Sequence, residues 1–237
     1  MALPKVGIPT YELNLPSTGK AIKYRPFVVK EEKVLLLALE SEDEKEIKNA
    51  VKDLIKNCVQ SRIKVEELPS FDLEYIFLKI RAVSVSEEIT MMVTCEDDNT
   101  TQVEVVININ EVNVFKPEGH TNKIMLDDVT GIVMKYPGMD RFIDSEFLNK
   151  DIKTDEVFDF IADSVDQIFN SEEVWDSSTT SKKEMISFIE SLTAKQFEPI
   201  QNFYETMPRL LHKFTVTNPN TGVESNYTIE GLQNFFV

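Results

Sequence analysis

The sequence is poor in the residues that cross-link small secreted folds or build phosphate-binding loops. It contains only two cysteines, Cys58 and Cys95, so it has no disulfide framework. Both lie in apolar patterns, which predicts buried thiols in a reducing compartment. Glycine occurs only seven times, and no glycine-rich loop follows a predicted strand. A P-loop and a dinucleotide-binding fingerprint are therefore excluded.

Long apolar runs are also missing. No stretch of the sequence approaches the length of a bilayer span, so no membrane partner is expected. Residues 1–5 lack the charged and apolar blocks of a signal peptide. We therefore expect the protein to be made and assembled in the cytoplasm.

Catalytic patterns are equally scarce. The only histidines, His120 and His212, lie near no Ser or Cys pattern of an activated nucleophile, and both are expected at the surface or at a sheet edge. Adjacent carboxylates such as Asp97-Asp98 lack the spacing and glycine of a calcium loop. We predict no catalytic, cofactor-binding or metal-binding residues. A hydrolase with scattered carboxylates stays an alternative, because such groups meet only in the folded chain.

Negative charge, in contrast, is abundant. The chain has 41 acidic and 25 basic residues, which gives a net charge of -16. Such a surface repels phosphate backbones and anionic lipids, so we expect no nucleic acid ligand. The acidity either keeps the protein soluble or matches a basic surface on a protein partner. An acidic decoy for a DNA-binding protein is a further alternative.

The first residues predict a β-hairpin followed by a helix. Apolar and polar residues alternate from Tyr11 to Leu15, a turn follows at residues 16–19, and residues 21–29 predict the return strand. The charged residues 30–33 then begin a helix whose apolar run covers residues 34–39. A hairpin packed against helices is therefore expected at this end of the chain.

Further helices precede a sheet. One apolar stripe predicts a helix over residues 44–58, and a second helix is expected after Pro69-Ser70. The apolar period then changes to two, which predicts a hairpin of residues 89–95 and 102–109. Two shorter strands are expected to extend this antiparallel sheet, at residues 123–126 and 129–136.

The second half predicts mainly helices. An apolar stripe over residues 157–169 indicates one helix, and the polar residues 171–180, with Trp175, indicate a loop. Capping boxes at Ser181 and Thr193 begin two more helices. A final β-hairpin is predicted over residues 212–216 and 223–229. The result is an α+β fold with two predicted domains, an α+β domain at 1–136 and a helical domain with its hairpin at 137–237.

Two segments near the N-terminus are long and unusual. One is the turn Leu15-Pro16-Ser17-Thr18-Gly19, and the other runs from Tyr24-Arg25-Pro26-Phe27 through Val29 to Lys33. In both segments the chain resembles the baseplate hub protein family of T-even-type contractile-tailed bacteriophages. The resemblance covers residues 9–40 and extends to 70–136 and 181–236. It implies a non-enzymatic protein without cofactors that acts in assembly of the central hub.

The resemblance also implies partners and a location. The partners are other phage baseplate hub or tail proteins, and self-association within the hub stays open. The location is the host cytoplasm during assembly, with retention in the tail baseplate of the virion. The alternative is a transient chaperone that escorts a hub or tape-measure protein and then leaves.

Binding hot spots are rich in aromatic residues and arginine, which makes Tyr24, Arg25, Pro26 and Phe27 the first candidate interface. The alternative is that Tyr24 and Phe27 anchor the hairpin on the core. Chain ends are normally polar, yet this one has a pair of adjacent aromatics. The second candidate interface is therefore this pair: Phe235 and Phe236. The alternative, which we favour, is that this end of the chain docks on its own helical half near Phe197 and Tyr204.

The C-terminal hairpin resembles a zinc-ribbon knuckle that some related phage proteins carry between two strands. Asn218 and Thr221 occupy the ligand positions here, and neither supplies a thiolate. We therefore expect a metal-independent hairpin whose turn depends on proline and glycine geometry.

Overall fold

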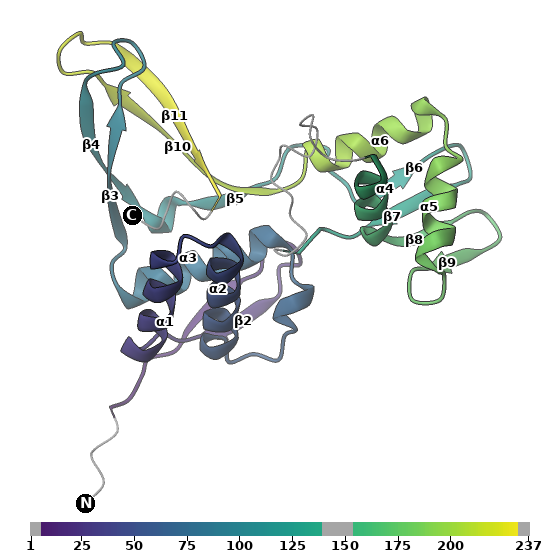
Figure 1. The fold of residues 1–237 in the computed structure, drawn as a ribbon, viewed down its shortest axis with the longest axis horizontal. Coiled ribbons are helices and arrows are strands. Elements are labelled where there is room, and N and C mark those ends of the chain that lie inside the picture. The colour runs from purple at the N-terminus through teal and green to yellow at the C-terminus, as the bar shows by residue number, and fades with distance from the viewer. Residues whose placement is uncertain (1–5, 139–153, 232–237) are drawn as a thin grey trace, which may run out of the picture. The chain divides into compact units, whose positions relative to one another are not determined.

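The computed structural model describes residues 6–138 and 154–231 of the chain. These residues form six α-helices and eleven strands, the strands in small antiparallel sheets (Figure 1). The predicted α+β class is confirmed. The chain divides into two compact units, the first made of residues 1–115 and 209–237 and the second of residues 116–208.

The first unit begins with a hairpin and three helices. Its opening strands pair antiparallel, with Leu13 opposite Ile22, and both side chains are buried. Asp43 caps the second helix by accepting hydrogen bonds from the N–H groups of Lys45 and Glu46. The elements are β1 (Tyr11–Asn14), β2 (Ala21–Tyr24), α1 (Val29–Glu40), α2 (Glu44–Cys58), a 3-10 turn (Val65–Glu67) and α3 (Ser70–Ser84).

Two long hairpins complete the first unit. One hairpin stands alone as a two-stranded sheet, and the other adds a short strand to form the order β11-β10-β5. Apolar residues of both hairpins pack into shared clusters, together with Leu78 and Ala82 of α3. The elements are β3 (Glu88–Thr94), β4 (Gln102–Asn108), a 3-10 turn (Ile109–Glu111), β5 (Asn113–Phe115), β10 (Arg209–Thr217) and β11 (Glu224–Glu230).

The second unit is a four-stranded antiparallel sheet, ordered β6-β7-β8-β9, with helices against one face. Ile124, Ile132 and Ile168 stand side by side across three strands and share a core with helix residues such as Phe203. The elements are β6 (Lys123–Met125), β7 (Gly131–Met134), α4 (Thr154–Asp163), β8 (Val165–Phe169), β9 (Val174–Asp176), α5 (Lys182–Glu190) and α6 (Ala194–Glu205).

Three sequence predictions are wrong in this unit. The strands at 123–126 and 129–136 do not extend the β3–β4 sheet, because they pair with each other and with β8. Residues 165–169 form a strand instead of continuing a helix, and a register shift opposite Val133/Met134 gives this strand its helix-like spacing of buried residues. Trp175 lies in β9, not in a loop.

The two capping boxes are confirmed. The side chain of Glu184 accepts from the N–H of Ser181 at 2.9 Å, and that of Gln196 accepts from the N–H of Thr193 at 3.0 Å. Both start helices where the sequence places them. These contacts reach only three residues along the chain, so the sequence alone specifies them.

The boundaries of the two units differ from those of the predicted domains 1–136 and 137–237. The terminal hairpin belongs to the first unit, since β10 pairs with β5 through Leu210 and Val114. Residues 116–136 belong to the second unit, since β6 and β7 pair with each other and β7 pairs with β8. Strand partners far apart in sequence decide both assignments.

Candidate protein interface at Arg25 and helix α1

Arg25 lies where β2 ends and the chain turns toward α1. Its N–H donates to the carbonyl of Cys58 at 3.0 Å, and Tyr24 forms an isolated antiparallel bridge with Val59. The N–H of Gln60 donates in turn to the carbonyl of Lys23 at 2.8 Å. The opening hairpin is thereby joined to the chain that leaves α2.

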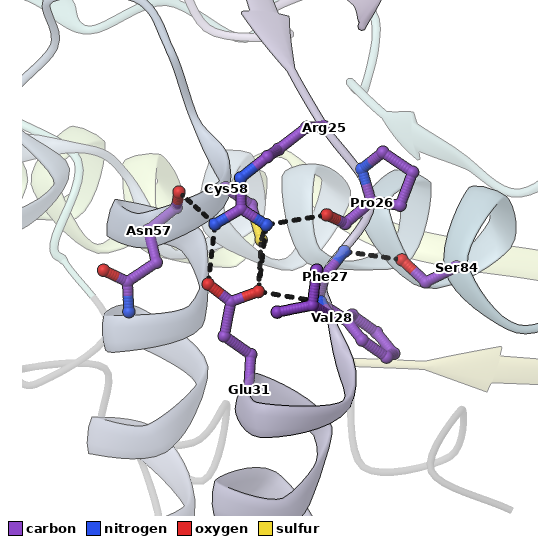
Figure 2. Close-up of polar contacts among 8 residues, drawn as sticks. All are labelled: Arg25, Pro26, Phe27, Val28, Glu31, Asn57, Cys58 and Ser84. Carbon is purple, nitrogen blue, oxygen red and sulfur yellow. Dashed lines mark hydrogen bonds and ion pairs between the residues drawn. The ribbon is translucent and has the colours of Figure 1, made fainter. Parts of the chain in front are cut away.

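The Arg25 side chain then ties three segments together (Figure 2). Its Nη2 and Nη1 donate to the two carboxylate oxygens of Glu31 at 2.7 and 2.9 Å, in the two-pronged geometry that suits this pair. Nη1 also donates to the carbonyl of Pro26 at 2.8 Å, and Nη2 to that of Asn57 at 2.9 Å. The side chains of Arg25 and Glu31 are only 19% and 12% exposed, so the ion pair is largely shielded from water.

Glu31 also caps the N-terminus of α1. Its carboxylate accepts a hydrogen bond from the N–H of Val28 at 2.9 Å, and Val28 occupies the N-cap position. An acidic group also interacts favourably with the helix N-terminus. Hydrogen bonds from Arg25 lower the pKa of Glu31, while those to Glu31 raise the pKa of Arg25. The pair therefore stays ionised and fixes the direction in which α1 leaves the hairpin.

Two neighbours complete this cluster. The N–H of Phe27 donates to Oγ of Ser84 at 3.0 Å, and that hydroxyl donates to the carbonyl of Ile80, which connects α3. The Cys58 thiol lies 3.7 Å from Arg25 Nη1 and is fully buried. Burial raises the pKa of Cys58 to about 12, so the thiol is protonated at neutral pH and is a poor nucleophile.

The structure brings three of the predicted interface residues into this cluster. Arg25, Pro26 and Phe27 are all partly buried, and Tyr24 lies in the core with its ring 5.8 Å from that of Tyr11. The other two predicted residues, Phe235 and Phe236, lie outside the described residues.

The surface that sequence reasoning missed is the outer side of α1. Only Leu35 and Ala38 of this helix are buried. Val29, Leu36 and Leu37 are 79%, 52% and 55% exposed. A stretch of helix that is apolar on all sides is normally covered, and the sequence shows this signal in the run Val34 to Leu39. We call this surface the α1 outer face, which comprises Val29, Lys33, Val34, Leu36, Leu37 and Glu40.

A second polar cluster surrounds His120 in the other unit. The prediction of a surface or edge histidine is wrong, because His120 is buried and stacks on the rings of Tyr136 and Phe203. Its Nδ1 lies 2.9 Å from Oγ1 of Thr206, and its Nε2 lies 2.9 Å from the hydroxyl of Tyr136. A hollow of about 200 Å³ lies beside the ring, and its lining includes Gly119, Thr121 and residues of β6 and α6.

The hydrogen bonds assign the protons of His120. The hydroxyl of Thr206 donates to the carbonyl of Asn202 at 2.6 Å, so its oxygen accepts from Nδ1–H of His120. The Nε2 atom then accepts from the hydroxyl of Tyr136. Burial lowers the pKa of His120, which keeps the ring neutral, and Lys116 lowers it further. Both ring nitrogens are occupied, as a structural histidine requires.

Asn218 and Thr221, at the positions of zinc ligands in a knuckle, form hydrogen bonds instead. Nδ2 of Asn218 donates to Asp97 at 2.9 Å and to Asp98 at 3.1 Å, and the hydroxyl of Thr221 donates to Asp97 at 2.5 Å. These contacts join the tips of the two long hairpins. Within residues 6–138 and 154–231, no group of three or more His, Cys, Asp or Glu side chains is placed to hold a metal ion. In the same residues, no helix is long and apolar enough to cross a membrane.

Comparison with known families identifies the class of protein. The family model described as T4 bacteriophage base plate protein matches residues 8–237. The chain belongs to this family. No curated protein and no solved structure matches it. The match confirms the baseplate part of the resemblance, so this is a baseplate protein of a phage tail with a structural role beside other tail proteins.

Proposed function

We propose that this baseplate protein is a non-enzymatic component of the central hub that works in assembly through contacts with other hub or tail proteins. The observation that carries this proposal is the α1 outer face, where four aliphatic residues of one helix are about half exposed or more. Apolar surface gathered on one element of a water-soluble unit is typical of a protein contact. Membership of the family supports a role in the baseplate, and the resemblance at residues 15–33 supports a role in its hub.

The Arg25 cluster prepares this contact. It fixes the N-terminal end of α1 to the hairpin, to α2 and to α3, so little conformational freedom is lost when a partner covers the helix. Pro26 and Phe27, partly exposed beside the helix start, extend the proposed surface. In this arrangement Tyr24 and Arg25 support the contact, and the pair Phe235 and Phe236 stays a second proposed contact.

The state of two candidate reactive groups, Cys58 and His120, supports a non-enzymatic role. The thiol of Cys58 is protonated and buried, and His120 is neutral with both nitrogens hydrogen-bonded. Neither group is free to act as a nucleophile or a general base.

Incorporation into phage particles tests the proposal. Phage carrying Leu36→Ser with Leu37→Ser should lose the protein from purified particles, as seen on denaturing gels, while the isolated variant melts like the wild type. The matched control is Met92→Ser, which alters a residue that is 56% exposed on β3, and it should be incorporated normally. Phe235→Ser with Phe236→Ser tests the second contact in the same assay.

The alternatives predict other results. A transient chaperone would co-purify with a hub or tape-measure protein from infected cells but be missing from finished particles of wild-type phage. Normal incorporation of the α1 variant would remove the α1 outer face from the proposal. Absence of the wild-type protein from both particles and assembly complexes would overturn the proposed function.

A further inference from the structure

The exposed charges along α1 have the opposite sign to those that the helix dipole favours at each end. Lys30 and Lys33 are exposed in its N-terminal half, whereas Glu40 is exposed at its C-terminal end. Glu42 and Asp43 follow directly and are also exposed. Cations favour a helix C-terminus and anions an N-terminus, so Lys30, Lys33 and Glu40 are placed unfavourably within α1, whereas Asp43 caps the next helix. A neighbouring helix that runs in the opposite direction would meet each end with the opposite charge.

The apolar residues are arranged for such a neighbour. Val29, Lys33, Leu36 and Glu40 follow at intervals of four, three and four residues, which places them in one stripe along the helix. Leu37 lies about 100° further round the helix, at the edge of this stripe, and is similarly exposed. The stripe therefore has Leu36 flanked by one cation and one anion, with Leu37 at its edge.

We propose that the α1 outer face binds the same face of a second copy of this chain, with the two helices antiparallel about a two-fold axis between Leu36 and Leu37. In this register Leu36 of each copy lies against Leu37 of the other. Lys33 of each copy then meets Glu40 of the other, and Lys30 lies toward Asp43 of the other. These charges then form four complementary positions in the pair.

Self-pairing is favoured over another occupant because the surface is complementary to itself. A two-fold interface requires one patch whose residues match those of its own copy, and the Lys33–Glu40 stripe has this property. The net charge of -16 opposes association at long range. At physiological ionic strength charges more than roughly 8 Å apart are largely screened, so local complementarity decides. One short helix per copy is a small contact, which corresponds to a weak, concentration-dependent dimer.

Charge exchange in the full chain tests this pairing. Sedimentation equilibrium of the wild type should show a monomer–dimer equilibrium. Lys33→Glu alone and Glu40→Lys alone should each raise the dissociation constant by about tenfold or more, because two attractive pairs become repulsive. An equimolar mixture of the two variants should form a heterodimer with near wild-type affinity. The control Lys20→Glu makes the same charge change in the β1–β2 turn and should leave dimerisation unchanged.

Restored association requires both variants to be folded, so the mixture distinguishes a broken contact from a broken fold. A wild type that stays monomeric throughout, a dimer unaffected by Lys33→Glu, or a mixture that fails to associate would each overturn the pairing. This inference goes beyond the proposed function and can fail separately. A monomeric wild type whose Leu36→Ser, Leu37→Ser variant is lost from particles would leave the hub role standing. If the wild type dimerises but the Leu36→Ser, Leu37→Ser variant is incorporated normally, the dimer stands and the hub contact of the α1 outer face does not.

Discussion

Each unit of this protein holds its chain segments together with a polar cluster, and the cluster is charged in the first unit but neutral in the second. In the first unit, Arg25 and Glu31 use full charges at a partly shielded position, and their charged groups are hydrogen-bonded to Pro26, Asn57 and Val28 as well as to each other. In the second unit, His120 connects Thr206 and Tyr136 as a neutral ring packed against aromatic neighbours.

The difference follows from what surrounds each cluster. A charge can be removed from water when an opposite charge and further donors or acceptors take the place of the solvent, as around Arg25. The ring of His120 packs against Tyr136 and Phe203, and its hydrogen-bond partners are neutral hydroxyl groups, so its neutral form is the stable one. The first cluster therefore depends on an intact ion pair, and the second depends on the absence of charge.

The largest effect is expected from Arg25→Ala. This change leaves Glu31 largely buried without its counter-ion, and we expect a loss of about 2–4 kcal/mol in the free energy of unfolding. Urea unfolding followed by circular dichroism measures it. The matched control is Lys23→Ala, which breaks an exposed pair with Glu12 and should change stability by less than about 1 kcal/mol. Equal stability of the two variants would contradict the role assigned to the Arg25 cluster.

The acid response separates the two clusters. The pKa of His120 is lowered in the folded chain, so below its unfolded value of about 6.5 the unfolded chain binds more protons and stability falls as the pH drops. The lowered pKa values of Glu31 and of carboxylates such as Asp97 produce the same direction of change, but only below their unfolded values of about 4. Melting temperatures of the wild type between pH 7.5 and pH 3 should therefore decline in two steps.

His120→Gln assigns the upper step. The variant should lose about 1–2 kcal/mol of stability at neutral pH through lost hydrogen bonding and stacking, and its decline near pH 6 should disappear. The lower step should remain, because Glu31 is untouched. An upper step that persists in His120→Gln would show that another group causes it.

A smaller effect is expected at the tips of the long hairpins, where neutral donors meet carboxylates. Hydrogen bonds from Asn218 and Thr221 lower the pKa of Asp97, and Asn218 is only 1% exposed. Asn218→Ala should cost about 1 kcal/mol, measured by urea unfolding, because it removes one of the donors that join the tips. Thr215→Ala, at an exposed cross-strand hydrogen bond of the same hairpin, is the control and should cost less.

The smallest effect is expected from metal removal. Asn218 and Thr221 hold their turn through hydrogen bonds to Asp97, so a chelator should leave the melting temperature unchanged. Elemental analysis of protein purified without added metal provides the check. Stoichiometric zinc together with a melting temperature lowered by the chelator would place a metal in the fold.

Local sequence determined the parts of this protein whose contacts lie a few residues apart. The capping boxes at Ser181 and Thr193 reach only three residues, and the β3–β4 hairpin follows from its own alternation and turn. The α+β class and the burial of Cys58 and Cys95 follow from the same periodicities. Each signal lies within one element and its turn, so no distant residue alters it.

Tertiary structure decided everything that depends on distant partners. The bulged pairing of β8 with β7 gave residues 165–169 a helix-like spacing, which the sequence pattern cannot distinguish from a helix. Strand pairing placed the final hairpin with the first unit, and packing against α6 turned His120 from an expected surface residue into a buried one. Likewise, sequence cannot tell which side of the apolar run Val34 to Leu39 is covered. Only the contacts of Leu35 and Ala38 decide that the α1 outer face remains open.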